Sequence, residues 1–141
     1  MSDALVQGAI VPVVQRDVVL MLEAGYVLLE MKKHKEAEEL FAGVCALVPA
    51  SEVPLMALGH LYFAMGRFSP ALKSHQRALS VNPGSAAVHA AIAETLLFLK
   101  RPQEAVASIA EAVRLEPDSP AATFARALEE AHDLGVFRRA R

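Results

Sequence analysis

Three of the prolines, Pro49, Pro83 and Pro117, are separated by a constant interval of 34 residues. Each stands at the end of a short stretch that is rich in apolar residues. The residue before a proline is disfavoured in the helical conformation, so each proline marks the end of a helix. Small residues recur at the same spacing, namely Gly25, Gly59 and Ala93 in one register and Ala37, Ala71 and Ala105 in another. Because small residues let two helices approach closely, the shared period predicts a stack of equivalent helix pairs.

A 34-residue period is typical of tetratricopeptide repeats, in which each repeat is a helix–turn–helix pair. The sequence therefore predicts an all-α fold of three such repeats stacked as a right-handed superhelix, with a C-terminal capping helix and a short N-terminal helix or arm. The predicted helices are residues 17–31, 34–47, 52–65, 69–81, 85–99, 102–115 and 119–134. Ser69 is expected to be an N-cap, because Pro70 then takes the first helical position.

The predicted domain organisation has three parts. Residues 1–16 form the N-terminal arm or helix, residues 17–134 form the repeat domain with its capping helix, and residues 135–141 form a flexible tail. Within this tail, Phe137 is the residue that could fold back onto the repeats. The last predicted helix carries Glu129 and Glu130, and such charge suits a helix that exposes one side of the stack to water.

Composition and charge exclude several classes of function. The formal net charge is −2, which is not the basic surface that nucleic acid or an anionic membrane requires. The apolar N-terminal stretch is interrupted by Pro12, Arg16 and Asp17, so no membrane insertion is expected. Cys45 is the single cysteine and cannot form an internal disulfide, which favours a cytoplasmic location. The hydrophobic content of 54% requires either a large core or an apolar binding surface.

No group of residues indicates catalysis, a cofactor or a metal site. The five histidines do not show the HExxH pattern or short Cys/His spacing, and no glycine-rich phosphate loop is present. His75 stands where the repeat usually carries an aromatic residue, so it is expected to be packed in the core. Cys45 lies near Phe41 and Val44 and is expected to be largely buried and unreactive. The chain is therefore predicted to be a binding protein and not an enzyme.

The concave face of a repeat stack is lined by the first helix of each repeat and is the usual binding surface. Gly25, Gly59 and Ala93 define the packing side, and helical spacing then predicts the opposite side. That side carries Val19, Leu22, Tyr26, Leu29, Val53, Met56, His60, Phe63, Ala87, Ala90, Glu94 and Leu97. The predicted peptide-binding residues among them are Leu22, Tyr26, Leu29, Met56, His60, Phe63, Ala90, Glu94 and Leu97.

Apart from Tyr26, His60 and Glu94 this face is apolar, which favours an apolar protein segment or helix as the ligand. Tetratricopeptide domains that bind the C-terminal peptides of heat-shock proteins hold the terminal carboxylate with Lys, Arg and Asn on this face. Here the face has no cation, so that activity is not expected. The alternative is that the N-terminal segment or a second subunit covers the face.

The run FAGVCALVP at residues 41–49, followed by LMALGHLYFAMGRFSPALKSHQRAL and VHAAIAETLLFLKRPQEAVASI, resembles the class II chaperones of bacterial type III secretion. These chaperones hold hydrophobic translocator proteins in the cytosol before export. The matching residues are Phe41, Cys45, Leu58, Gly59, Gly66, Phe68, Ala71, His89, Ala90, Ala91, Glu104 and Ala105. The resemblance covers about residues 22–115.

This resemblance implies that the concave groove binds an apolar segment of a secreted translocator. The residues to which it assigns that contact are Tyr26, Leu29, Met56, His60, Phe63 and Leu97. The family usually has a longer N-terminal region used for dimerisation, so a homodimer and a heterocomplex both stay open here. Three other functions also stay open: a general scaffold for protein partners, a chaperone of the needle subunit of the same secretion system, and a regulatory subunit of an enzyme on another chain.

Overall fold

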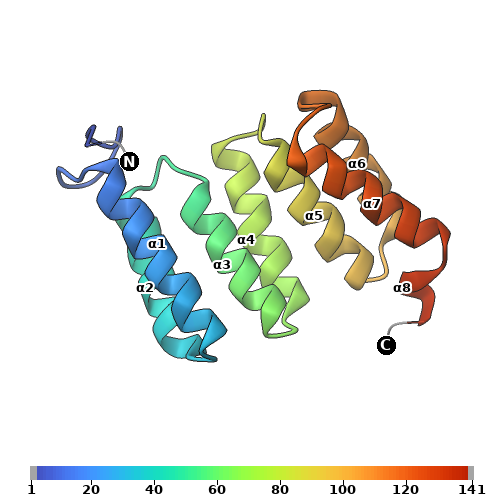
Figure 1. Cartoon of the computed structure of the whole chain (residues 1–141), viewed down its shortest axis with the longest axis horizontal. Helices are drawn as coiled ribbons and strands as arrows, with labels where there is room; N and C mark the ends of the chain where they lie inside the picture. Colours follow the sequence, from blue (N-terminus) through green and yellow to red (C-terminus); the bar gives the residue numbers. More distant parts are fainter. Residues whose placement is uncertain (1–2, 140–141) are drawn as a thin grey trace.

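The computed structural model describes residues 3–139, and of Arg139 it describes the backbone alone. Within these residues the chain forms helices and no strand, and the helices lie side by side in chain order (Figure 1). They are α1 (Gln15–Glu30), α2 (His34–Leu47), α3 (Val53–Ala64), α4 (Phe68–Val81), α5 (Ala86–Phe98), α6 (Pro102–Leu115), α7 (Pro120–Asp133) and α8 (Val136–Arg139). The predicted all-α repeat fold is confirmed, and the predicted boundaries of α1 to α7 lie close to the observed ones.

The helices pair as the 34-residue period predicts. The pairs α1–α2, α3–α4 and α5–α6 are the three repeats, and each second helix also contacts the first helix of the next repeat. The helix α7 packs on both α5 and α6, so it occupies the place of the first helix of a fourth repeat. The stack is therefore continuous from α1 to α7, and α8 contacts α7 at its end.

Small residues on the first helices receive large side chains from the second helices. A Cβ atom on Gly25 would lie 2.2 Å from Cε1 of Phe41, and one on Gly59 would lie 2.3 Å from Cε1 of His75. The third repeat has Ala93 and Ile109 at the same positions, and both are buried. His75 is 1% exposed, which confirms the prediction of a core histidine. Close helix approach is thus the physical reason for the periodic small residues.

The turn inside each repeat needs a residue in the left-handed region. Gly66 has φ of 74°, and the residues one period before and after it, Lys32 and Lys100, have φ of 61° and 62°. Glycine adopts this conformation without steric cost, whereas a lysine is rarely found there. The turn geometry is therefore the same in all three repeats although the residue type is not.

Two serines cap helices in the structure. The Oγ atoms of Ser85 and Ser119 accept hydrogen bonds from the backbone N–H groups of Val88 and Ala122, at 3.2 and 3.1 Å. The prediction that Ser69 is an N-cap is wrong, because α4 begins at Phe68 and places Ser69 inside the first turn. The Phe68 side chain at the start of this helix packs on the rings of Phe63 and Phe98.

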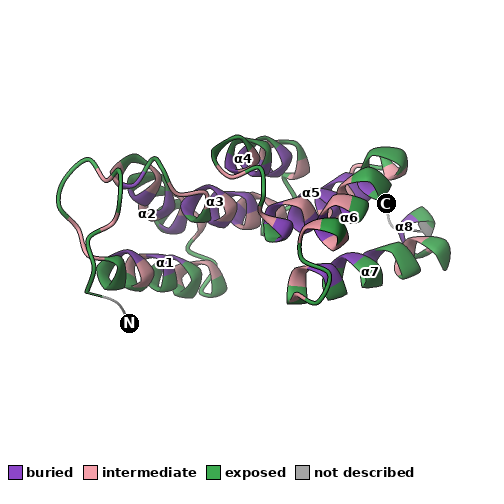
Figure 2. Cartoon of the chain, turned by 90° about the horizontal axis from the view of Figure 1, so that it is seen from above, coloured by how far each residue is buried: buried purple, intermediate pink, exposed green. Residues whose placement is uncertain are grey.

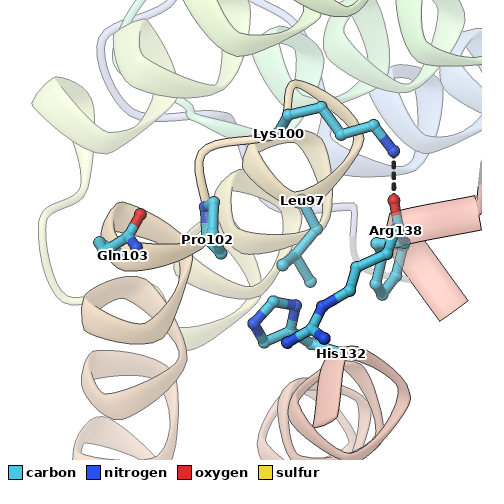
Figure 3. Close-up of a pocket in the computed structure, with 7 residues that line it drawn as sticks. Leu97, Lys100, Pro102, Gln103, His132 and Arg138 are labelled. Carbon is cyan, nitrogen blue, oxygen red and sulfur yellow. Dashed lines mark hydrogen bonds between the residues drawn. The ribbon is translucent and has the colours of Figure 1, made fainter. Parts of the chain in front are cut away.

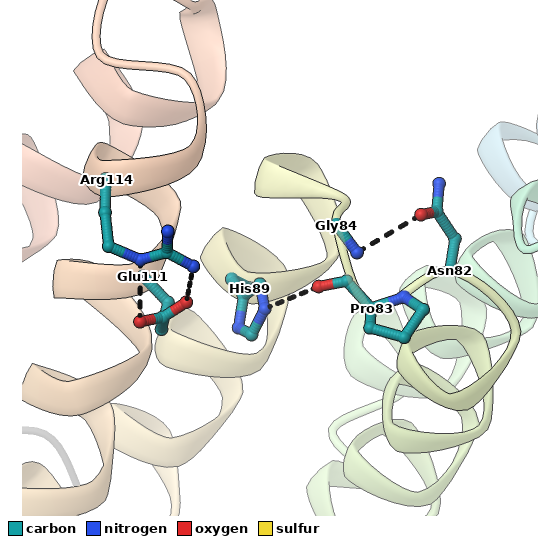
Figure 4. Close-up of polar contacts among 6 residues, drawn as sticks. All are labelled: Asn82, Pro83, Gly84, His89, Glu111 and Arg114. Atoms are coloured by element: carbon teal, nitrogen blue, oxygen red, sulfur yellow. Dashed lines mark hydrogen bonds and ion pairs between the residues drawn. The ribbon is translucent and has the colours of Figure 1, made fainter.

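The turn between α4 and α5 is fixed by side chains from both of its ends (Figure 4). Asn82 Oδ1 accepts a hydrogen bond from the Gly84 backbone N–H at 3.2 Å. His89 Nε2 donates to the carbonyl oxygen of Pro83, also at 3.2 Å. His89 therefore connects the first turn of α5 to the loop before it. Figure 4 also shows Glu111 paired with Arg114 on α6, an exposed ion pair of one helical turn.

Residues 3–14 form an arm and not a helix. The arm folds back on itself through hydrogen bonds from the Val6 N–H to the Val13 carbonyl and from the Gln15 N–H to the Ala4 carbonyl, both 2.9 Å. Its tip is attached to the repeats, because the Ile10 N–H donates to the carbonyl of Leu47 at 2.9 Å. The arm thus lies at the N-terminal end of the stack, beside the end of α2 (Figure 1).

The C-terminal residues fold back at Phe137. Its side chain is buried, and its ring centroid lies 5.4 Å from that of Phe98 on α5. The expectation that Phe137 could return to the repeats is confirmed, while Ala140 and Arg141 of the expected flexible tail lie outside the described residues. The three-part division of the chain stays a prediction.

Cys45 is partly buried and not largely buried as predicted. It lies at the junction of two groups of core residues and contacts both. Burial raises the pKa of its thiol, so the thiolate is less populated than in a free cysteine.

Candidate functional site

The first helices of the repeats form one continuous face. Direct contacts join α1 to α3, α3 to α5 and α5 to α7. Seen from above, α1 and α7 lie on the same side of the stack, opposite α4, with α3 and α5 between them (Figure 2). This is the face that the sequence predicts to be concave, and the predicted peptide-binding residues all come from α1, α3 and α5.

A hydrogen bond on this face joins the first repeat to the second. The Tyr26 hydroxyl and His60 Nδ1 are 2.9 Å apart, and the two residues are one period apart in the chain. Burial lowers the pKa of His60 and raises the pKa of Tyr26, so both groups are neutral at pH 7. The two polar groups satisfy each other and leave the surrounding face apolar.

A cavity of about 300 Å³ opens beside His60, between α3, α5 and α7. Its lining residues are Met56, His60, Ala87, Ala90, Ala91, Glu94, Pro120, Ala121 and Phe124. We call it the Glu94 cavity, because Glu94 is the one carboxylate among these residues. Burial raises the pKa of Glu94, and no residue between 3 and 138 forms a hydrogen bond or ion pair with its side chain.

A second cavity of about 300 Å³ lies at the other end of the same face. Its lining residues are Leu5, Val6, Gln7, Gln15, Val18, Val19, Leu22, Val48, Ser51 and Val53. The arm supplies Leu5, Val6 and Gln7, so it forms a wall at the first repeat. It contributes no residue to the Glu94 cavity, and that part of the face is not covered by the arm.

Three predicted peptide-binding residues lie one period apart on this face, and two of them are less accessible than the sequence suggests. The three are Leu29, Phe63 and Leu97. The Phe63 ring centroid lies 5.1 Å from that of Phe68 and 4.9 Å from that of Phe98, so this ring packs between α4 and α5. The expectation that position 63 lies outside the inter-helix core is therefore wrong. The reason is that Phe68 of α4 and Phe98 of α5 both contact its ring, and Phe98 in turn contacts Phe137 of α8.

Leu97 is 2% exposed, and the residues near it include His132 of α7 and Phe137 of α8. It lines a third cavity, of about 310 Å³, together with Lys100, Pro102, Gln103, His132, Phe137 and Arg138 (Figure 3). The Lys100 ammonium donates a hydrogen bond to the carbonyl of Phe137 across this cavity. Leu97 therefore supports the C-terminal end of the stack, and a ligand in the groove does not reach it without a movement of these helices.

The nine predicted peptide-binding residues thus divide into two groups. Tyr26, Leu29, Met56, His60, Phe63 and Glu94 keep some exposure, whereas Leu22, Ala90 and Leu97 are buried. Their role in binding a peptide stays a prediction.

Sequence reasoning missed the contribution of α7. Ala121 and Phe124 line the Glu94 cavity, and they stand one period after Ala87 and Ala90. The period itself was thus the signal that α7 continues the face as a first helix of a further repeat. Among residues 3–139 no group of His, Cys, Asp and Glu side chains could hold a metal ion, and no helix is long and apolar enough to cross a membrane.

Comparison with known proteins supports the fold. Residues 56–120 match a family model described as tetratricopeptide repeat. A stretch of 63 residues is 40% identical to the inactive TPR repeat-containing thioredoxin TTL3 of Arabidopsis thaliana, and it spans 45% of this chain and only 9% of that protein. This relative is therefore informative about the repeats alone.

Two solved structures match over most of both chains. SycD of Yersinia enterocolitica, a type III secretion chaperone in complex with a peptide of the translocator YopD, has a TM-score of 0.73 at 20% identity and covers 86% of this chain and 95% of its own. PcrH in complex with the chaperone binding region of PopB has a TM-score of 0.71 at 19% identity, with 82% and 97% covered. Residues 56–120 thus match tetratricopeptide repeats, and the fold of the chain resembles that of type III secretion translocator chaperones.

Proposed function

We propose that this chain is a cytosolic chaperone that holds an apolar segment of a type III secretion translocator in the groove formed by α1, α3, α5 and α7. The observation that carries the proposal is the Glu94 cavity, an open apolar cavity of about 300 Å³ on the concave face. An exposed apolar surface on a monomer is a typical site for a protein partner. The similar folds of SycD and PcrH, each in complex with part of a translocator, make a translocator the first partner to test.

The chemistry of the groove favours a largely apolar segment over an acidic one. None of the residues that line the Glu94 cavity or the second cavity at the arm is Lys or Arg, so a terminal carboxylate finds no cation there. Each large apolar side chain that becomes buried contributes roughly 1.5–3 kcal/mol before the cost of ordering the segment. Three such contacts give an affinity in the micromolar range, which suits a partner that must be released for export.

Ala87 allows a direct test, because it is exposed and lines the Glu94 cavity. Ala87→Arg places a large charged side chain at the entrance, and we expect it to abolish binding without unfolding the helices. Ala42→Arg is the matched control, because Ala42 is exposed on the second helix of the first repeat and lines neither cavity of the concave face.

The experiment is co-purification of partners from the native host with the wild-type chain and both variants, followed by calorimetry with the partner. We expect a translocator with the wild type and the Ala42→Arg variant, and none with the Ala87→Arg variant. Circular dichroism checks that both variants keep their helices. Recovery of other, folded partners with all three proteins would support a general scaffold in place of a chaperone.

A further inference from the structure

We propose that the segment bound in the groove carries one basic side chain, Lys or Arg, among its apolar residues, and that this cation pairs with Glu94 inside the cavity. The inference rests on the proposed function and specifies which apolar segments the groove accepts. It makes Glu94 a residue that determines specificity and not one more part of the apolar wall.

The first observation is that the Glu94 side chain has no hydrogen-bond or ion-pair partner among residues 3–138. It projects from the middle of α5 into a cavity whose other lining residues are apolar except for His60. His60 already shares its Nδ1 with the Tyr26 hydroxyl, and its lowered pKa leaves it uncharged at pH 7. The carboxylate charge is thus uncompensated by any side chain of the cavity.

The second observation is that the cavity is open to solvent. Water that reaches Glu94 therefore limits the desolvation cost of its charged form when no ligand is bound. The pKa of Glu94 is already raised by partial burial. A segment with apolar side chains alone would remove the remaining water, so Glu94 would either stay a buried carboxylate without a partner or take up a proton, and both cost binding free energy. Such a segment is therefore disfavoured at this cavity, and discrimination of this kind is a common source of specificity.

A lysine or arginine side chain fits both the apolar lining of the cavity and the Glu94 carboxylate. Its aliphatic stem can lie against Met56 and Ala87, while its charged end reaches the carboxylate. Phe124 of α7 is 41% exposed and also lines the cavity, and its ring offers a face for the cation. An acidic side chain at the same place would be repelled by Glu94, so the preference has a definite sign.

The test begins with selection from a phage library of random dodecapeptides, with the wild-type chain and with the Glu94→Gln variant as targets. Glutamine has the same shape as glutamate and lacks the charge. We expect the wild type to enrich apolar peptides that contain one Lys or Arg, and the variant to enrich apolar peptides without it. Equal enrichment of basic residues by both targets would overturn the inference.

Calorimetry then uses the peptide most enriched by the wild type and the same peptide with Met in place of its basic residue. We expect Glu94→Gln to weaken the basic peptide by about tenfold or more. We expect the Met peptide to be bound at least as tightly by the variant as by the wild type. The two changes together should add little to either one alone, which is the mark of a direct pair. Tighter binding of the basic peptide to Glu94→Gln would show that the carboxylate opposes ligands.

The Ala87→Arg variant separates this inference from the proposed function. If Ala87→Arg abolishes peptide binding while Glu94→Gln leaves the basic peptide unaffected, the groove is the site and the inference about the cation is wrong. If no selected peptide responds to Ala87→Arg, the proposed function and the inference fail together.

Discussion

The imidazole of His75 occupies the space that a methyl group on Gly59 would need, because a Cβ atom there would lie 2.3 Å from its Cε1. Phe41 stands in the same relation to Gly25, one period earlier in the chain. The two pairs have the same geometry but differ in chemistry, since one ring can take up a proton and the other cannot. The contact limits which residues can stand at position 59, and the imidazole makes the stability of the folded chain depend on pH.

Gly59→Ala should destabilise the protein, whereas Gly43→Ala should stabilise it. The first change forces the His75 ring to move in a packed core, and overpacking of this kind costs about 1–3 kcal/mol. Gly43 lies inside α2, and a Cβ atom on it would meet no other atom within 4 Å, so alanine there adds helix propensity of about 0.5–1 kcal/mol. Urea unfolding of both variants measures the two changes, and a gain in stability from Gly59→Ala would contradict the packing described for this pair.

Stability should fall as the pH drops below 6.5, and His75 should be one cause. Burial and the nearby His60 lower the pKa of His75 from 6.5 to about 3 in the folded state. Between these two pH values the unfolded chain binds more protons than the folded chain. The contribution of His75 to the free energy of unfolding is therefore complete above pH 6.5 and decreases as the pH falls toward 3.

His75→Phe copies the Phe41 arrangement and removes this titration. The melting temperature of the variant should therefore decrease less than that of the wild type when the pH is lowered from neutral toward the folded-state pKa of His75. Carboxylates titrate in the same range in both proteins, so the difference between the two curves is the quantity that isolates the histidine. Parallel curves would mean that His75 is protonated as easily in the folded chain as in the unfolded one.

Phe63→Asp should lower the free energy of unfolding by about 3 kcal/mol or more, because it places a carboxylate among the rings of Phe68 and Phe98. Phe124→Asp is the matched control, since Phe124 is 41% exposed and the same change there should have little effect on stability. Thermal melting followed by circular dichroism compares the two. Similar melting temperatures for both variants would show that the aromatic contacts of Phe63 contribute little.

Cys45 should react with a bulky thiol reagent more slowly in the folded chain than in the chain unfolded by urea. Partial burial restricts access, and the raised pKa lowers the thiolate fraction. Cys45→Ser should cost on the order of 1 kcal/mol, because a hydroxyl replaces a thiol between two apolar clusters. Absorbance of the coloured group that the reagent releases follows the reaction. Equal rates in the folded and the unfolded chain would contradict the burial of the sulfur atom.

The helix pairs and their boundaries were predictable because they follow local rules that recur with the 34-residue period. Pro49, Pro83 and Pro117 mark the ends of second helices, and Gly25 and Gly59 mark the crossings. The left-handed turns at Lys32 and Lys100 were not predictable from residue type, because lysine seldom adopts this conformation. Only the position relative to Gly66 reveals them.

The helices and the face that form the site were predictable, but the burial of some of its residues was predicted wrongly. Helical spacing places Met56, His60 and Glu94 on one face, and these residues do line one cavity. Spacing along one helix does not show what the next elements cover, so the burial of Leu97 under α7 and α8 was missed. The contact of Phe63 with Phe98 also joins positions that are not one period apart, so the repeat does not reveal it.

The helix α3 belongs to both groups of core residues, since Leu55 lies in one group and Leu58 and Leu61 lie in the other. Repeat proteins commonly lose their end units first, while inner units stay folded. Here an opening on either side of α3 would expose an almost wholly apolar helix to water. The slowest amide hydrogen exchange should therefore be found in α3 and α5, which puts two of the three walls of the Glu94 cavity on the last part of the chain to melt, while its α7 wall belongs to an end of the stack. Opening of the cavity by local unfolding would therefore begin at α7 and leave its α3 and α5 walls in place.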